Sequence, residues 1–126
     1  MTLHFTACLA GWVGQIGKVN LWLADKDGAP NPRQVCVATQ IAESLHILEA
    51  KAANYLDLFV DRAKACGDGE EPWWLDEIDF REGLSEDLLT YSLHFSLQGD
   101  DGGLWTVTML VRDDEHRPFR FERLQG

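Results

Sequence analysis

The feature that most constrains the fold is an amphipathic stretch over residues 31–66. Its apolar side chains recur at steps of three and four residues, which places them on one face of a helix: Ile41, Leu45, Leu48, Ala52, Tyr55, Leu56, Phe59 and Ala63. Asn31 followed by Pro32 suits an N-cap and a first helical position, and Gly67 suits the residue after the last turn. The pattern predicts one long helix over residues 31–66.

The length of this helix sets a geometric problem. At a rise of about 1.5 Å per residue it would extend about 50 Å, whereas ordinary strands are only about 20–30 Å long. The helix therefore overhangs its sheet, breaks into two near residues 48–53, or offers its surplus apolar face to a second copy of the chain. We expect a single long or gently bent helix, and a homodimer through this helix is one possible consequence.

Five segments alternate apolar and polar side chains as strands do: residues 3–13, 18–24, 89–98, 104–112 and 119–124. The clearest is 89–98, whose strict alternation predicts one face on the core and one in water or at a polar interface. The order strand–strand–helix–strand–strand–strand predicts an α+β fold, with an antiparallel sheet of about five strands covered on one face by one long helix. We expect a single domain over residues 1–126.

The net charge of −10 is concentrated in one segment. Residues 68–87 contain nine acidic residues and one basic residue, Arg81, so they carry −8 of the total. An acidic chain binds a nucleic-acid backbone or an anionic membrane only through a local basic patch, and the sequence shows none. Because there is also no apolar run of about 20 residues and no basic leader, we expect a cytoplasmic protein with neither nucleic acid nor membrane as its partner.

The same segment mixes large aromatic side chains with its acids. Aromatic anchors inside a charged rim are typical of protein interfaces, and acidic residues attract a basic partner. We therefore predict a site for a protein partner, possibly basic, formed by Glu70, Glu71, Trp73, Trp74, Asp76, Glu77, Asp79, Phe80 and Glu82. The competing interpretation is that Trp73 and Trp74 close the end of the core while the acids face water. The segment has no clean period, so helix, edge strand and loop all remain open.

No motif for catalysis or metal binding is present. The three cysteines are far apart and lack a C-x-x-C pair, which argues against a disulfide framework and a zinc ribbon. The histidines have no metal-like spacing, and the acids lack the ordered spacing of a calcium loop. We expect no catalytic residue, no metal ligand and no cofactor. Tyr91 and His94 are possible ligand or interface residues.

The order of these features is similar to that of small bacterial domains of unknown function, some of them found among the immunity proteins of polymorphic-toxin systems. The resemblance is carried by the strand pair ending in a polar Asp-Gly loop, the Pro-Arg-Gln-Val opening at residues 32–35, the helix residues Tyr55 and Phe59, and a Trp-Thr-Val strand near the end. It covers most of the chain and brings no catalytic residues. It implies a binding protein, one that neutralises a toxin such as a basic nuclease.

We therefore expect a non-enzymatic, protein-binding domain of the immunity or accessory kind. It would use the acidic-aromatic segment together with the polar sheet face around Ser92, His94 and Ser96. One alternative is a small-ligand-binding or enzymatic domain with a cavity between sheet and helix that contains His94 or Tyr91. Another is an acidic secretion chaperone, although such proteins usually begin with a helix and this chain begins with strands.

Overall fold

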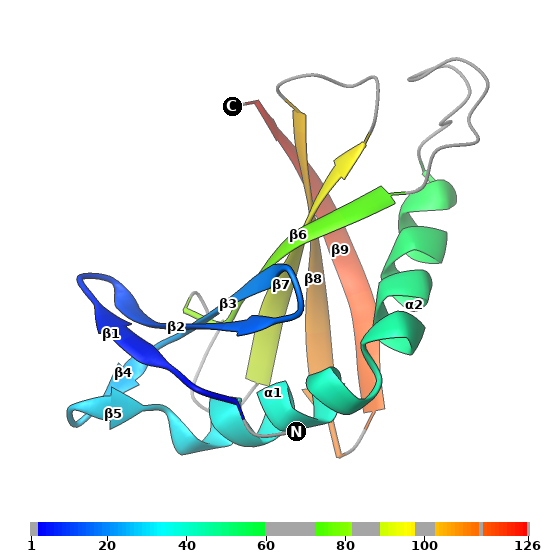
Figure 1. Cartoon of the computed structure of the whole chain (residues 1–126). Coiled ribbons are helices and arrows are strands. Elements are labelled where there is room, and N and C mark those ends of the chain that lie inside the picture. Colours follow the sequence, from blue (N-terminus) through cyan, green and yellow to red (C-terminus); the bar gives the residue numbers. More distant parts are fainter. Residues whose placement is uncertain (1–2, 60–72, 82–88, 98–102, 114, 126) are drawn as a thin grey trace.

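A computed structural model describes residues 3–59, 73–81, 89–97, 103–113 and 115–125 (Figure 1). These residues form a seven-stranded mixed sheet, a two-stranded sheet and two short helices. The strands of the large sheet are, in spatial order, β1 (Thr6–Cys8), β2 (Gly11–Ile16), β3 (Val19–Leu23), β6 (Trp73–Asp79), β7 (Leu89–Leu97), β8 (Gly103–Arg112) and β9 (Glu115–Gln125). The remaining elements are the hairpin of β4 (Asp25–Lys26) and β5 (Ala29–Pro30), and the helices α1 (Pro32–Glu43) and α2 (Leu45–Asp57).

The prediction of a five-stranded antiparallel sheet under one long helix is wrong. The acidic segment contributes a central strand, β6, which pairs in parallel with β3 and antiparallel with β7. The sheet is therefore mixed, because β3 and β6 are connected through the helices rather than by a tight turn. The N-terminal strand expected over residues 3–13 is divided, because the chain turns at Leu9 and Ala10 between β1 and β2.

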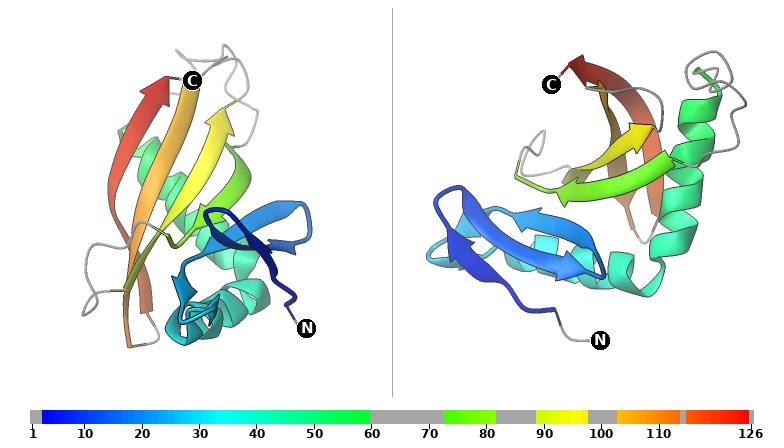
Figure 2. Two further views of the ribbon diagram at one scale, coloured as in Figure 1. Left: turned by 90° about the vertical axis from the view of Figure 1, so that its left-hand side faces the viewer. Right: turned by 45° about the horizontal axis from the view of Figure 1, so that its top comes forward.

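The helix breaks at Ser44, not near residues 48–53. The backbone of Ser44 has φ −134° and ψ 32°, outside the helical region. Its hydroxyl donates to the Gln40 carbonyl over 3.0 Å, a local bond of the kind by which serine competes with helix geometry. Figures 1 and 2 show α1 lying across the lower end of the sheet and α2 turning steeply to run beside β9.

This break answers the length problem, because each short helix follows a different part of the twisted sheet. The apolar period continues through the break, with Ile41 buried in α1 and Leu48 and Leu56 buried in α2. The part of the predicted helix over residues 60–66 lies outside the described residues. A straight overhanging helix was the reason to expect a homodimer, so the dimer stays a prediction without that support.

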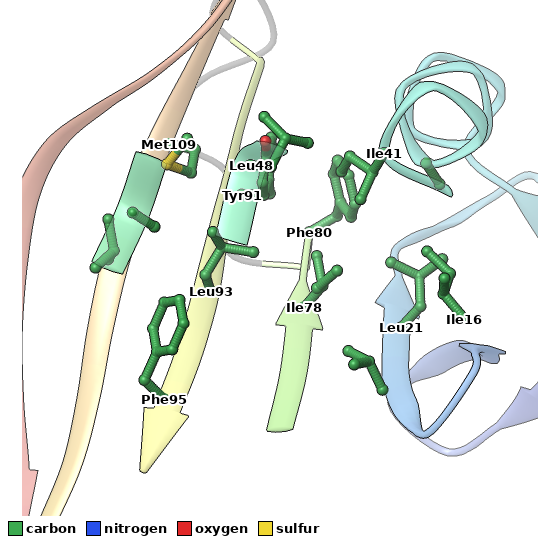
Figure 3. Packing of buried hydrophobic residues seen from close by; sticks show 14 of the residues in the cluster. Ile16, Leu21, Ile41, Leu48, Ile78, Phe80, Tyr91, Leu93, Phe95 and Met109 are labelled. Atoms are coloured by element: carbon green, nitrogen blue, oxygen red, sulfur yellow. The ribbon is translucent and has the colours of Figure 1, made fainter. Parts of the chain in front are cut away.

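The core fills the space between the two helices and one face of the large sheet. Leu21, Ile78, Leu93 and Phe95 have no exposed surface. In Figure 3, Ile41 of α1 points toward Phe80, and Leu48 of α2 lies beside Tyr91. The other face of the sheet carries no helix among the described residues, although two of its side chains, Thr90 and Thr108, are buried.

One buried side chain ties the start of α1 to the ends of β3 and β6. Asn31 caps the helix by accepting hydrogen bonds from the backbone N–H groups of Arg33 and Gln34. The Gln34 side chain accepts from the Ala24 N–H over 2.8 Å and donates to the Phe80 carbonyl over 3.1 Å. Two backbone groups beyond the strand ladders are thereby satisfied, as buried backbone requires.

Candidate functional site

Polar side chains lie opposite one another on neighbouring strands, on the sheet face that points away from the helices. This face is turned toward the viewer in the left view of Figure 2, where α2 lies behind the strands. One row runs Asn20, Glu77, His94, Thr106 and Glu122. The next row runs Trp22, Asp79, Ser92, Thr108 and Arg120. We call these two rows, together with Trp74, Asp76 and Ser96, the outer face. Side chains directly opposite on neighbouring strands are close enough to interact, so the outer face extends without a break from β3 to β9, although Thr108 within it is buried.

A β-bulge in β6 changes which residues belong to the outer face. Asp76 lies between the paired residues Leu75 and Glu77, and β7 has no residue opposite it. The Asp76 carboxylate accepts a hydrogen bond from the hydroxyl of Ser96, which lies opposite Trp74 on the outer face. Because a bulge re-aims one side chain, the two consecutive carboxylates of Asp76 and Glu77 point to the same side of the sheet.

An internal cation occupies one end of this face. The Arg81 guanidinium donates from Nε to Asp79 Oδ1 over 3.0 Å and from Nη2 to Oδ2 over 2.9 Å. Its central carbon lies 4.5 Å from the ring centroid of Trp22, which pairs directly with Asp79 across β3 and β6. The hydrogen bonds to Asp79 raise the pKa of Arg81. We call Trp22, Asp79 and Arg81 the filled cradle.

The other end of β6 has the same kinds of side chain without a cation. Trp74 is 56% exposed, and no described ring or cation stacks on it. Glu77 is half-buried and makes no hydrogen bond or ion pair with a described residue. Asp76 is exposed and is bonded to the Ser96 hydroxyl. We call Trp74, Asp76 and Glu77 the open cradle.

Two buried polar atoms of the outer face have no hydrogen-bond partner among the described residues: Trp22 Nε1 and Thr106 Oγ1. Leaving such an atom unsatisfied costs about 1–3 kcal/mol, so most buried polar atoms in native proteins are paired. Thr106 lies directly opposite His94 in the row that also contains Glu77. Each of these two unsatisfied atoms is therefore expected to lower the stability of the folded chain.

The structure separates the residues predicted to bind a partner. Trp73 and Phe80 lie in the core, 4% and 0% exposed, and the Trp73 indole N–H donates to Asp57 of α2 over 3.0 Å. Trp74, Asp76, Glu77 and Asp79 lie together on the outer face. Glu70, Glu71 and Glu82 lie outside the described residues. The alternation of β6 thus divides the tryptophan pair between core and surface.

Tyr91 and His94 lie on opposite sides of the sheet. Tyr91 is 2% exposed on the core side, whereas His94 is half-buried on the outer face. They are three residues apart on one strand, and side chains an odd number of positions apart point to opposite faces. These two residues therefore cannot form one ligand site.

The bonds around Ser96 do not have the order of a hydrolase triad. In a triad the serine is hydrogen-bonded to a histidine, which a carboxylate orients. Here the Ser96 hydroxyl donates to the Asp76 carboxylate itself, and His94 is opposite Glu77 and Thr106. This arrangement offers hydrogen-bonding groups and negatively charged carboxylates to a molecule that contacts the outer face.

Sequence reasoning missed a buried polar network that joins both helices to the sheet. The Tyr91 hydroxyl lies 2.7 Å from His116 Nδ1, and His116 Nε2 lies 3.2 Å from Gln40 Oε1. A neutral imidazole protonated on Nε2 satisfies both contacts, because the phenol then donates to Nδ1. Lys51 of α2 donates to the His116 carbonyl over 3.0 Å. His116 is 6% exposed, and burial raises the pKa of Tyr91.

Replacing Tyr91 by phenylalanine is expected to lower the free energy of unfolding by about 1–3 kcal/mol, because His116 Nδ1 loses its donor inside the core. Chemical denaturation of the two proteins measures the difference. Tyr55→Phe is the matched control, because Tyr55 is only half-buried. Removing its hydroxyl should cost less than about 0.5 kcal/mol. Equal losses in the two variants would contradict a stabilising role for the network.

The same substitution should change the response to alkaline pH. The unfolded phenol ionises near pH 10, whereas the buried Tyr91, with its raised pKa, stays neutral in the folded chain. Its contribution to stability is therefore present below about pH 10 and is lost as the pH rises further. Tyr91→Phe should lack this part of the alkaline decline in a pH series of denaturation curves.

Three surface grooves are lined by described residues, and one of them lies where α2 meets Trp73 of β6. A groove of about 490 Å³ on the outer side of β1–β3 is lined by His4, Thr6, Val13, Gly14, Gln15 and Asn20. Two others, of about 320 and 360 Å³, lie at the β8–β9 turn and along the side of α2. None of these three grooves has Tyr91 or His94 in its lining.

Two further features are decided within the described part of the chain. No group of three or more His, Cys, Asp and Glu side chains there could hold a metal ion. Neither α1 nor α2 is both long and apolar enough to cross a bilayer.

No protein-family model, curated protein or solved structure matches this chain.

Proposed function

We propose that this chain is a non-enzymatic protein-binding domain, of the immunity or accessory kind, whose outer face binds a basic partner. The observation that carries the proposal is the placement of Trp74. This indole is 56% exposed on a sheet face rich in carboxylates, while its neighbour Trp73 is buried. Exposed tryptophans ringed by polar groups are the side chains most often found to dominate binding energy.

The charges around Trp74 favour a basic partner over an acidic one. The outer face and the neighbouring Arg81 together carry four carboxylates, Asp76, Glu77, Asp79 and Glu122, against two guanidinium groups, Arg81 and Arg120, a balance of −2. Complementary charge increases association rates and disfavours partners of the wrong sign. The strands beneath are paired on both sides from β2 to β8, so the surface is held by a rigid frame.

The test is capture of the partner from a lysate of the source cells, at low and at high salt, with mass spectrometry as the readout. Wild type is compared with Trp74→Ser, and with Ile47→Ser as a control, because Ile47 is 67% exposed on α2. We expect a basic partner that Ile47→Ser retains. Trp74→Ser should bind it at least about 30-fold more weakly by calorimetry, the usual size of a hot-spot effect.

Two results would count against this function. Equal binding by Trp74→Ser and wild type would show that the interface is elsewhere. Failure of the wild type to retain any partner at either salt concentration would remove the protein-binding proposal itself.

A further inference from the structure

The filled cradle shows what kind of group the outer face accommodates. A guanidinium there makes two hydrogen bonds to one carboxylate and lies on the face of an indole. Bidentate pairing with a carboxylate and stacking on an aromatic ring are the two modes of contact that distinguish arginine from lysine. The molecule thus contains an occupied arginine site made from residues of β3 and β6.

The open cradle repeats this composition on the same face of the sheet, although its indole is on β6 itself and the indole of the filled cradle is on β3. It has the indole of Trp74 in place of Trp22, and the carboxylates of Asp76 and Glu77 in place of Asp79. Trp74 and Asp76 both flank the hydroxyl of Ser96, since one lies opposite Ser96 and the other is bonded to it. Arg81 acts on Glu77 only through its charge, and no described cation is hydrogen-bonded to Asp76 or Glu77 or stacked on Trp74.

From this correspondence we infer that the open cradle receives an arginine side chain of the partner protein. The inference rests on the proposed function and specifies the chemistry of the contact. Two adjacent carboxylates repel each other, and a cation bound near both offsets this repulsion. The exposed face of Trp74 adds a cation–π contact. Nearby arginines of the outer face are engaged: Arg81 with Asp79, and Arg120 with Thr108.

A titration with N-acetyl-arginine amide tests the cradle without requiring the partner. Two-dimensional NMR spectra of the labelled protein report on each indole N–H separately, with the buried Trp73 as an internal reference. We expect a saturable shift of the Trp74 signal with the arginine compound and none with N-acetyl-citrulline amide, which is its neutral counterpart. Equal shifts with both compounds, or none with arginine, would overturn the inference.

Matched variants test the role of the two carboxylates. Asp76→Asn and Glu77→Gln should each weaken arginine binding about 1.4- to 5-fold, the range expected for an exposed ion pair. Glu43→Gln makes the same change of charge at an exposed position of α1 and should leave binding unchanged. An equal weakening by Glu43→Gln would reduce the effect to net charge and contradict a specific cradle.

Arg81→Ala provides an independent check, because it empties the filled cradle. The added arginine compound should then shift the Trp22 signal as well as the Trp74 signal. Absence of a Trp22 shift in a variant that keeps the wild-type spectrum elsewhere would remove the template on which the inference depends.

The inference and the proposed function fail differently. A captured partner that needs Trp74 but binds Glu77→Gln and Asp76→Asn with wild-type affinity and salt dependence would leave the protein-binding function standing and refute the arginine contact. A wild-type protein that binds no partner refutes the function, whatever the titration shows.

Discussion

Replacing Phe80 by alanine is expected to lower the free energy of unfolding by about 3–5 kcal/mol, the usual cost of truncating a buried phenylalanine. Phe80 has no exposed surface, and its ring centroid lies 4.9 Å from that of Tyr91. It also sits directly under Ile41 of α1 (Figure 3). The cavity would therefore open where the first helix meets the sheet. Urea denaturation followed by tryptophan fluorescence and circular dichroism measures the loss.

Trp74→Ala is the control: Trp74 lies on β6, just before Phe80 in the chain, but on the surface, and a surface truncation should cost less than about 1 kcal/mol. The pair of variants also separates the contribution of the core from that of the outer face, because Phe80 is buried and Trp74 is exposed. Phe80→Ala should affect binding only through the fraction of unfolded protein. A Phe80→Ala protein of wild-type stability that no longer binds its partner would place Phe80 at the interface and contradict the core described above.

Replacing Gln34 by leucine is expected to cost about 2–4 kcal/mol. Leucine fills nearly the same volume, but it leaves the Ala24 N–H and the Phe80 carbonyl without the partners that Gln34 supplies. Each unsatisfied group in a buried setting costs about 1–3 kcal/mol. Thermal and chemical denaturation give the total. Hydrogen exchange gives the local effect, since the Ala24 amide should lose its protection.

Gln15→Leu is the matched control, because Gln15 is exposed and its side chain bonds to Asn20 over 3.1 Å at the surface. Its effect should stay within about 0.5 kcal/mol. If Gln34→Leu were as mild, water would be satisfying the two backbone groups, and the clamp between α1 and the sheet would have no energetic importance.

Regular alternation made part of this fold predictable. The segment 89–98 was expected as a strand with one buried face, and β7 confirms it with Leu93 and Phe95 fully buried. The prediction succeeded because a period of two residues has one structural meaning over nine positions. The opposite placement of Tyr91 and His94 follows from the same alternation.

Other elements were hidden for physical reasons. The break at Ser44 leaves the apolar period of the helices intact, so no periodicity could reveal it. In β6 the extra residue of the bulge interrupts the alternation, so the sequence pattern did not identify this segment as a strand. His116 lies outside the strand expected over residues 119–124, because β9 begins earlier than its apolar residues suggest, at Glu115. Its pairing with Val111 places it on the core side, which a tight hairpin register would have indicated.

The bulge in β6 has a consequence for how such a surface can change over evolution. If Asp76 were removed, the remaining residues would alternate regularly, with Leu75 and Ile78 still inward and Glu77 still outward. Asp76 is thus an insertion that leaves the frame of the strand unaltered. A chain of this architecture can gain or lose a recognition charge at this point by a single codon, without moving a core side chain. If the outer face binds a partner as proposed, its specificity can therefore change through length variation as well as through substitution.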